Sequence, residues 1–429
     1  MKLWDKGYTV ENLIEEFTVG NDRELDMHLA KYDVIASKAH ATMLESIGIL
    51  EKTELDSLLA ELDEMMANIE AGTFEIAESF EDVHSKIEYD LTQKLGDAGK
   101  KIHTGRSRND QVLVCLHLYI KEEIQSLKNQ VKELFELLIN LSNTHKDKII
   151  PGYTHLQAAM PSSFGMWFAA YAESLIDDIH LLNAAFKIAD QNPLGSGAGY
   201  GSSFPLNRTM TTKAMGFETL KYNSVAAQMS RGKVEKSTAY AMSSVAGTLS
   251  KLSMDITLYM SQNFGFLTFP DELTTGSSIM PHKKNPDVFE LTRAKCNKIQ
   301  NLPNELLLIT SNLPSGYHRD LQLVKESFIP AVESLKACLT VVIFSLEKII
   351  LKSNITDDPK YDYIYSVDVL NEDMKNGMPF RDAYKNVAQS VADGSYKPMK
   401  QLDHTHEGSI GNLCNDEIKV KFEKAFGDE

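Results

Sequence analysis

Apolar residues recur at every third or fourth position through one long stretch of the chain. The repeat runs through Leu113, Leu116, Ile120, Ile124, Leu127, Val131, Leu134, Leu138 and Leu141. This spacing places the apolar side chains on one face of an α-helix and predicts a helix from about Asn109 to His145. At 1.5 Å per residue the helix is about 55 Å long, which is more than a compact domain of this size needs. The pattern therefore predicts long partner helices.

Further regions carry helical patterns long enough to supply these partners. We expect helices at about Ser162–Asp190, at about Ser230–Phe264 and in a pair at Asn285–Asn312 and Asp320–Lys352, the last interrupted by Pro330. The second of these regions is rich in small residues, which let helices approach one another closely. Signals for β-strands are nearly absent. The sequence predicts an all-α fold with a long central helical bundle.

The two ends of the chain differ from this bundle. The first hundred residues show shorter helical patterns, for example Asp22–Leu50 and Thr53–Ala71, with Gly72 as a carboxyl-terminal cap. After about Lys352 the sequence becomes more polar and contains turn-forming residues. We predict three domains: an amino-terminal helical domain at 1–106, the central bundle at 107–352 and a small carboxyl-terminal helical domain at 353–429.

One uncharged run, from Ile149 to Ala172, is long enough to be considered as a membrane span. It contains Pro151, Gly152 and Pro161, which interrupt regular structure, and we interpret it as a loop that leads into a helix. The amino terminus lacks the apolar segment of a secretory signal. We therefore expect a cytoplasmic protein without a membrane span.

Charge and cysteine content narrow the classes of partner. The net charge is −16, which repels nucleic acids and anionic lipid surfaces, so a small anionic ligand would need a local basic cluster. The four cysteines form no CxxC pair, and His84 has no second histidine or cysteine at the spacing of a metal site. The glycine-rich segment Gly195–Ser203 lacks the ending of a phosphate-binding loop, which leaves two interpretations: a flexible loop that gives backbone amides to a ligand, or a plain linker. These patterns indicate neither a metal site nor a redox motif.

The segment from Thr274 to Asp287 combines hydroxyls, lysines and an amide in a short stretch. Gly276 gives the backbone freedom ahead of the hydroxyls, and Pro281 and Pro286 stop regular structure on either side of the lysines. This composition is typical of a mobile catalytic lid over an anionic ligand.

Other segments carry candidate chemistry that has simpler explanations when each is taken alone. His103–Gln111 has two arginines, a hydroxyl and an amide at the start of the long helix, which favours a carboxylate receptor over simple helix capping. His155 could be a general acid or base, but a single loop histidine is more often structural. Glu81–His84 could be a solvated acidic turn, and Gly316–Glu326 could be a helix cap with a charged face.

Together these segments resemble a known family. The pattern Gly276-Ser277-Ser278-x-Met280-Pro281-x-Lys283-x-Asn285 resembles the signature of the fumarase and aspartase superfamily. His103–Gln111, Gly152–Gln157 and Tyr317–Glu326 resemble its argininosuccinate lyase branch, and the resemblance runs through most of residues 1–350. It implies an all-helical, three-domain fold and a cofactor-free elimination that splits argininosuccinate into arginine and fumarate. It also implies a homotetramer in which each active site takes segments from three subunits.

The resemblance assigns roles to residues of this chain. Ser277 would be the general base, and His155, with Thr154 beside it, would protonate the leaving nitrogen. Lys283 and Asn285 would stabilise the doubly charged aci-carboxylate intermediate, and Glu290 would orient His155 or bind substrate. The residues expected to bind or orient the substrate are Asp26, Asp82, His84, Ser107, Arg108, Asn109, Arg231, Tyr317, Gln322 and Lys325.

The sequence also departs from the branch at several positions. Ser230-Arg231-Gly232 stands where the branch has an arginine between two aspartates, and Gly199–Ser203 replaces a Leu-Ala-Gly-Thr-Thr pattern. These departures concern how the arginine end of a substrate is held. Two alternatives therefore stay open: a related lyase acting on adenylosuccinate or a modified argininosuccinate, and a crystallin-like structural protein that keeps the fold without turnover.

Overall fold

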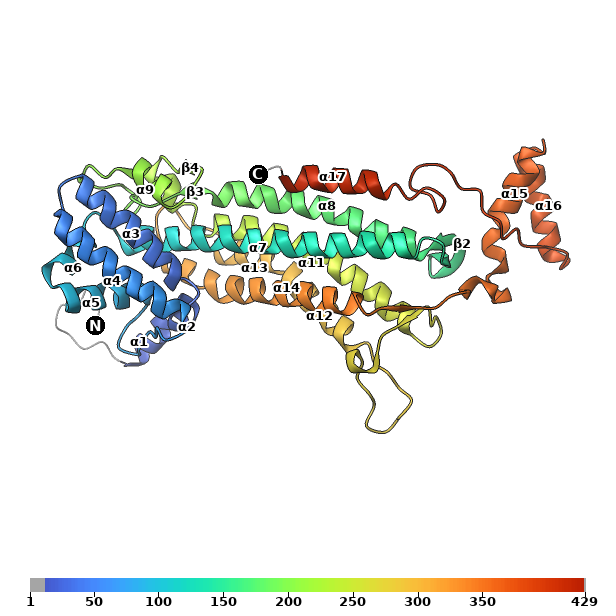
Figure 1. Cartoon of the computed structure of the whole chain (residues 1–429), viewed down its shortest axis with the longest axis horizontal. Helices are drawn as coiled ribbons and strands as arrows, with labels where there is room; N and C mark the ends of the chain where they lie inside the picture. Colours follow the sequence, from blue (N-terminus) through green and yellow to red (C-terminus); the bar gives the residue numbers. More distant parts are fainter. Residues whose placement is uncertain (1–11, 428–429) are drawn as a thin grey trace.

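The computed structural model describes residues 12–427. The molecule is elongated, with a group of short helices at one end, long helices side by side in the middle and a smaller helical arm at the other end (Figure 1). The described residues are mostly helical, as predicted. Three two-stranded sheets also occur among them.

The middle of the molecule is a bundle of long helices with one continuous apolar core. Its helices are α7 (Arg108–Thr144), α8 (Phe164–Ala189), α11 (Lys233–Met260), α12 (Asp287–Gln300), α13 (Leu302–Ile309) and α14 (Val324–Leu346). The predicted boundaries of α7 agree with the structure to one residue, because its apolar repeat is strict and a capping box closes its first turn. The apolar repeat from Leu113 to Leu138 is fully buried.

Two predictions for the bundle are wrong. Pro330 lies inside α14 without ending it. Proline removes one backbone hydrogen bond of the helix, but its neighbours Phe328, Ile329 and Val332 are buried in the core and keep the segment helical. The segment predicted as Asn285–Asn312 is two helices, α12 and α13, which meet at Asn301 with Pro303 in the first turn of the second.

The segment expected to be a loop after α7 is a β-hairpin, which corrects that interpretation. Strand β1 (Ile149–Thr154) pairs antiparallel with β2 (Gln157–Ser163), and the register shifts between Pro151 and Tyr153. Pro151 and Gly152 suggested a loop, but an irregular hairpin tolerates both at such a shift. The hairpin lies at the end of the bundle away from the amino-terminal helices (Figure 1).

The amino-terminal helices pack around a second, smaller apolar core. They are α1 (Asn12–Val19), α2 (Asp22–Asp26), α3 (Ala30–Ser46), α4 (Lys52–Glu70), α5 (Val83–Leu95) and α6 (Asp97–Lys101). The helix predicted at Asp22–Leu50 is thus split between α2 and α3. Gly72 has a φ of +70° just after α4, as expected of a glycine that follows a helix.

Shorter elements connect and extend the bundle. They are β3 (Gln191–Asn192), α9 (Arg208–Ala214), β4 (Thr219–Leu220), α10 (Ser224–Gln228), β5 (Leu267–Thr268), η1 (Asp271–Leu273), η2 (Arg319–Gln322), β6 (Ile350–Leu351), η3 (Ile355–Asp357), η4 (Pro359–Tyr365), α15 (Ser366–Lys375), α16 (Phe380–Ala392) and α17 (Asn415–Gly427). Helix α17 returns along α8, with Phe422 stacked on Phe135 of α7 (Figure 1). The predicted domain boundaries remain a prediction, and α17 fits a separate third domain least well.

One helical stretch among the described residues, Arg319–Leu346, is long and apolar enough by composition to cross a membrane. Half of its apolar window is buried inside the structure, where it packs in the bundle. A core helix of a soluble protein has the same properties, so this stretch is weak support for a membrane span.

Candidate active site

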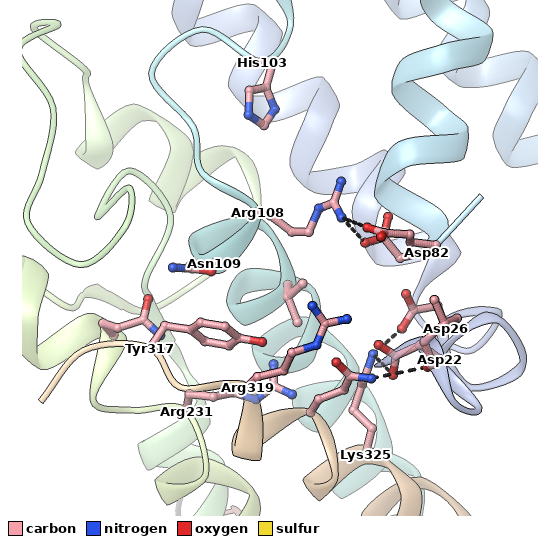
Figure 2. A pocket seen from close by; sticks show the side chains of 15 residues that line it. Asp22, Asp26, Asp82, His103, Arg108, Asn109, Arg231, Tyr317, Arg319 and Lys325 are labelled. Carbon is pink, nitrogen blue, oxygen red and sulfur yellow. Dashed lines mark hydrogen bonds and ion pairs between the residues drawn. The ribbon is translucent and has the colours of Figure 1, made fainter. Parts of the chain in front are cut away.

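A cleft of about 320 Å³ opens where the amino-terminal helices meet the start of α7. Its side chains come from α1, α2, α7, α10, η2 and α14 and from the segments that precede α5, α7, α11 and η2 (Figure 2). The cleft is lined by Val19, Asp22, Asp26, Glu81, Asp82, His103, Arg108, Asn109, Val112, Gln228, Arg231, Tyr317, Arg319, Gln322 and Lys325. The lining contains both carboxylates and cations, so it can bind groups of either sign.

Lys325 forms the buried floor of the cleft together with two carboxylates. Its Nζ lies 2.6 Å from Oδ1 of Asp26 and 2.8 Å from Oδ1 of Asp22. Burial by itself would lower the pKa of Lys325, but the two carboxylates raise it above its usual value, so the ammonium group stays charged. Burial also raises the pKa of Asp22 despite the nearby lysine. The floor joins α2 to α14, which are far apart in the sequence.

Arg108 forms one wall of the cleft. Its Nη1 lies 2.7 Å from Oδ2 of Asp82 and 3.1 Å from Oε2 of Glu81, and its Nη2 donates to Ser85 Oγ at 2.8 Å (Figure 2). Asp82 also caps α5 by accepting from the Ser85 N–H at 2.8 Å. Burial opposes ionisation of Asp82, but His84 and Arg108 hold its pKa below the usual range. The guanidinium group of Arg108 is therefore held in one orientation by Glu81, Asp82 and Ser85.

The first turn of α7 presents Asn109 to the cleft. Ser107 caps the helix, since its Oγ accepts from the Asn109 N–H at 3.3 Å, and Asp110 accepts from the Ser107 N–H at 2.8 Å. The other oxygen of Asp110 accepts from the backbone N–H groups of Gly195 at 3.0 Å and Gly197 at 2.9 Å. Burial raises the pKa of Asp110 to about 6 although all three donors favour its ionised form. The glycine-rich segment thus gives two amides to Asp110 and anchors the start of α7.

The rim of the cleft is held by residues near the start of α14. Gln322 donates from Nε2 to the carbonyl oxygen of Thr18 at 2.9 Å, and Arg319 donates to the same oxygen at 2.7 Å. Arg231 donates to the carbonyl oxygen of Leu321 at 2.9 Å. Tyr317 points into the cleft (Figure 2). Eight of the ten residues expected to bind or orient the substrate therefore line the cleft, and Ser107 lies next to it as the cap of α7.

His84 is the exception. It is fully buried behind the cleft wall, where its Nδ1 lies 3.1 Å from Oδ1 of Asp33, and it does not line the cleft. Asp33 also accepts from Gln111 Nε2 at 3.0 Å, so α3, α5 and α7 meet at this point. In this placement His84 holds the wall in position, and its role in binding or orienting the substrate stays a prediction.

Asp33, His84 and Cys115 bring a carboxylate, an imidazole and a thiol within 4.8 Å of one another. The sequence argument against a metal considered only nearby residues and could not detect this cluster. Burial raises the pKa of the Cys115 thiol well above its usual value, and His84 is paired with Asp33. Asp33 and His84 form a buried ion pair, and the Cys115 thiol lies beside it, with Sγ 3.8 Å from Oδ1 of Asp33.

The lid-like segment lies apart from the cleft, on a loop that stands out from the bundle (Figure 1). Thr275 and Asn285 pair across its base, with the Asn285 N–H donating to the Thr275 carbonyl oxygen at 2.8 Å. Within the loop, Ser277 Oγ accepts from the backbone N–H groups of Ile279 at 3.4 Å and Met280 at 3.2 Å. Lys283 is exposed. Two amides therefore already point at the hydroxyl expected to be the base.

Thr154 and His155 lie at the tip of the hairpin, beyond the far end of α7. Both are exposed, and Glu290 is exposed in the first turn of α12. Among residues 12–427 no hydrogen bond or ion pair joins His155 to Glu290. One copy of the chain therefore carries the cleft, the loop and the hairpin at separate places.

Sequence reasoning missed several members of the cleft. Asp22 and Arg319 line it, and Asp33 supports it from behind. Asp22 and Asp26 are four residues apart at the start of a predicted helix, which is the one local signal that could have indicated a shared carboxylate site. Asp33 gives no such signal, because its partners come from α5 and α7.

Comparison with known proteins assigns the chain to a family. A family described as lyase matches residues 7–301. The argininosuccinate lyase of Parabacteroides distasonis is 58% identical over 99% of this chain and 96% of its own length. That of Thermotoga neapolitana is 40% identical over 90% of this chain and 98% of its own length. The chain belongs to the argininosuccinate lyase family. Its fold agrees with this assignment.

Two solved structures resemble this argininosuccinate lyase family member in fold. An EDDS lyase variant with bound fumarate has a TM-score of 0.76 at 19% identity, covering 98% of this chain and 90% of that chain. A fumarate lyase:delta crystallin from Brucella melitensis bound to cobalt has a TM-score of 0.75 at 16% identity, covering 97% and 95%. At such low identity these likenesses establish the fold alone.

The buried Asp33–His84 pair makes stability depend on pH. Burial would lower the pKa of His84, but Asp33 and Asp82 raise it above 6.5. The stability that this raised pKa contributes is fully present below pH 6.5 and is lost as pH rises through the raised value. We predict that the urea midpoint of unfolding declines as pH rises through the raised pKa of His84. The variant His84→Gln should remove this decline and lower the free energy of unfolding by about 3 kcal/mol.

The control is the double variant Asp33→Asn/His84→Gln, which removes both charges of the pair. It should be more stable than His84→Gln alone. An unchanged pH dependence of unfolding in His84→Gln would contradict the assignment.

Proposed function

We propose that this protein is an argininosuccinate lyase that splits argininosuccinate into L-arginine and fumarate. The observation that carries the proposal is the 58% identity, over 99% of the chain, with proteins of that name. The cleft supports it, because argininosuccinate has carboxylates and a guanidinium group, and the cleft offers paired cations and carboxylates. The buried free cysteines Cys115, Cys296 and Cys338 fit a cytoplasmic location.

Ser277 is the proposed general base. It removes the proton from the carbon next to a succinyl carboxylate, and the electron pair moves into that carboxylate to give an aci-carboxylate. A serine hydroxyl ionises only when donors surround its oxygen, and the amides of Ile279 and Met280 already lie at 3.4 and 3.2 Å. Lys283 from the same loop adds a positive charge when the loop closes and excludes water.

The intermediate then collapses, the carbon–nitrogen bond breaks and the electron pair leaves with the guanidino nitrogen. His155 supplies a proton to that nitrogen, directly or through water, with Thr154 beside it and Glu290 orienting its ring. Asn285 donates a hydrogen bond to the carboxylate on which charge develops. Asn109, Arg108 and Lys325 hold the succinyl end in the cleft, with Asp26, Asp82, Arg231, Tyr317 and Gln322 around them. The proposed reaction uses no cofactor.

The proposed active site is shared between copies of the chain. The cleft lies at the first residue of α7, and the hairpin follows its last residue, so a helix of 37 residues, about 55 Å long, separates them. When two copies pack with α7 antiparallel, the hairpin of one approaches the cleft of the other. Exposed apolar side chains such as Tyr240, Met254, Leu291 and Leu308 lie on bundle helices available for such packing. We propose a homotetramer with each site built from three subunits.

A second candidate substrate is favoured by one observation. A cavity of about 410 Å³ beside the cleft shares Gln228 and Arg231 with it and is lined by Lys233 and Lys236. These cations suit an additional anionic group on the leaving half of the substrate. Adenylosuccinate or an argininosuccinate modified at its arginine end would carry such a group.

The substrate is tested by following fumarate release from argininosuccinate and from adenylosuccinate with purified protein and no added metal. We expect the specificity constant for argininosuccinate to be higher by at least about 100-fold, since a site built for one set of polar groups rejects another. A preference for adenylosuccinate would replace the proposed substrate. Absence of fumarate from both substrates would contradict the lyase assignment.

The base is tested by Ser277→Ala. We expect kcat to fall by about 1,000-fold or more with little change in melting temperature, because Ser277 lies on an outward loop and only its hydroxyl is removed. The matched control is Ser278→Ala in the same loop, which should keep most of the activity. Wild-type turnover by Ser277→Ala would refute the assignment of the base.

A further inference from the structure

The turn of the hairpin has an unusual backbone. Thr154 pairs with Gln157, which leaves His155 and Leu156 as a two-residue turn. Their φ angles are +53° and +57°, in the left-handed region. A two-residue turn with both central residues left-handed is type I′, for which Asn-Gly is the favoured sequence because both residues tolerate positive φ. Leucine lacks the short polar side chain that stabilises this conformation locally.

Packing within the chain does not account for this leucine either. The side chain of Leu156 is 70% exposed, so the hairpin gains little from its apolar surface. A residue that suits neither the backbone of its turn nor the core of its own chain is a strained position of the kind that concentrates at functional sites. Leu156 directly follows His155, the proposed acid, so any contact of Leu156 also fixes the imidazole.

The partner that the proposed tetramer offers is a second copy of this chain. Antiparallel packing of α7 brings the hairpin of one copy to the cleft of another, as argued above. Three large side chains near the cleft rim are at least partly exposed: Met229 at 54%, Tyr317 at 39% and Leu323 at 49%. They provide apolar surface that would cover a leucine arriving from outside.

We propose that Leu156 is a positioning residue that packs against the cleft rim of a second copy and holds His155 over the bound substrate. The inference rests on the proposed function and deepens it. The strain of the turn presents both side chains outward at one point, so the leucine supplies contact area and the histidine supplies the proton. Residues at position 156 that fit the left-handed turn better than leucine, but lack its apolar side chain, are therefore expected to lower kcat.

The test compares Leu156→Asn, Leu156→Gly and Leu156→Met with wild type in purified, fully assembled protein. Asn and Gly fit the left-handed turn better but remove the apolar side chain, whereas Met keeps it. We expect the Asn and Gly variants to lose kcat by on the order of 10- to 100-fold with KM changed by less than about threefold, because His155 is misplaced while the cleft is intact. The Met variant should stay within about threefold of wild type.

The matched control is Val420→Asn, which removes an apolar side chain that is 67% exposed on α17, away from the cleft and the hairpin. It should leave kcat and KM unchanged. Wild-type kinetics in both Leu156→Asn and Leu156→Gly would overturn the inference. The same result is expected if Leu156 contacts a protein other than this chain. Failure of wild type itself to release fumarate would instead overturn the proposed function, so the two failures are distinguishable.

Discussion

The length of α7 is the constraint on which the rest of the structure depends. Its apolar face is continuous from Leu113 to Leu141, and the helix is unbroken over 37 residues. The amino-terminal end of this helix carries Arg108 and Asn109, and the hairpin with His155 follows the other end. A rigid element of this length keeps the two groups apart within one copy. Chemistry that needs both groups at one carbon atom therefore requires another copy.

The cleft at the amino-terminal end of this helix is held by several charged contacts. Each of its walls is fixed by groups that are distant in sequence: Lys325 binds Asp26 on the floor, Arg108 binds Asp82 on the wall and Asp110 binds the amides of Gly195 and Gly197. These contacts leave the cleft formed before any partner arrives. The loop around Ser277 and the tip of the hairpin are exposed instead, which fits the proposal that they complete a site on another copy.

The sequence predicts this fold well where local periodicity decides the structure. The limits of α7 follow from a strict apolar repeat and a capping residue, and Gly72 ends α4 as expected. The hairpin was missed because Pro151 and Gly152 signal a loop, whereas the pairing with β2 depends on contacts that no local pattern shows. Pro330 predicts a break that does not occur, because the burial of its neighbours outweighs the loss of one backbone hydrogen bond.

The candidate site was predictable to a different degree. Residues such as Arg108, Asp82 and Lys325 could be named from the family resemblance, and the structure places them in one cleft. The position of His84 behind the wall could not be predicted, because its partner Asp33 belongs to another helix. The strained turn at Leu156 could not be predicted either, because neither composition nor residue spacing indicates a positive φ at a leucine.

Mixing two inactive variants tests the central claim of a shared site most directly. Arg108→Ala removes a cleft residue and His155→Asn removes the proposed acid, and each should be inactive alone. The two chains are unfolded together and reassembled in equal amounts. If a site takes Arg108 from one subunit and His155 from another, each residue is intact in about half of the cases, so both are intact in about one quarter of the sites. We predict recovery of about one quarter of wild-type activity. A mixture as inactive as its components would show that each chain builds its own site and would contradict the account.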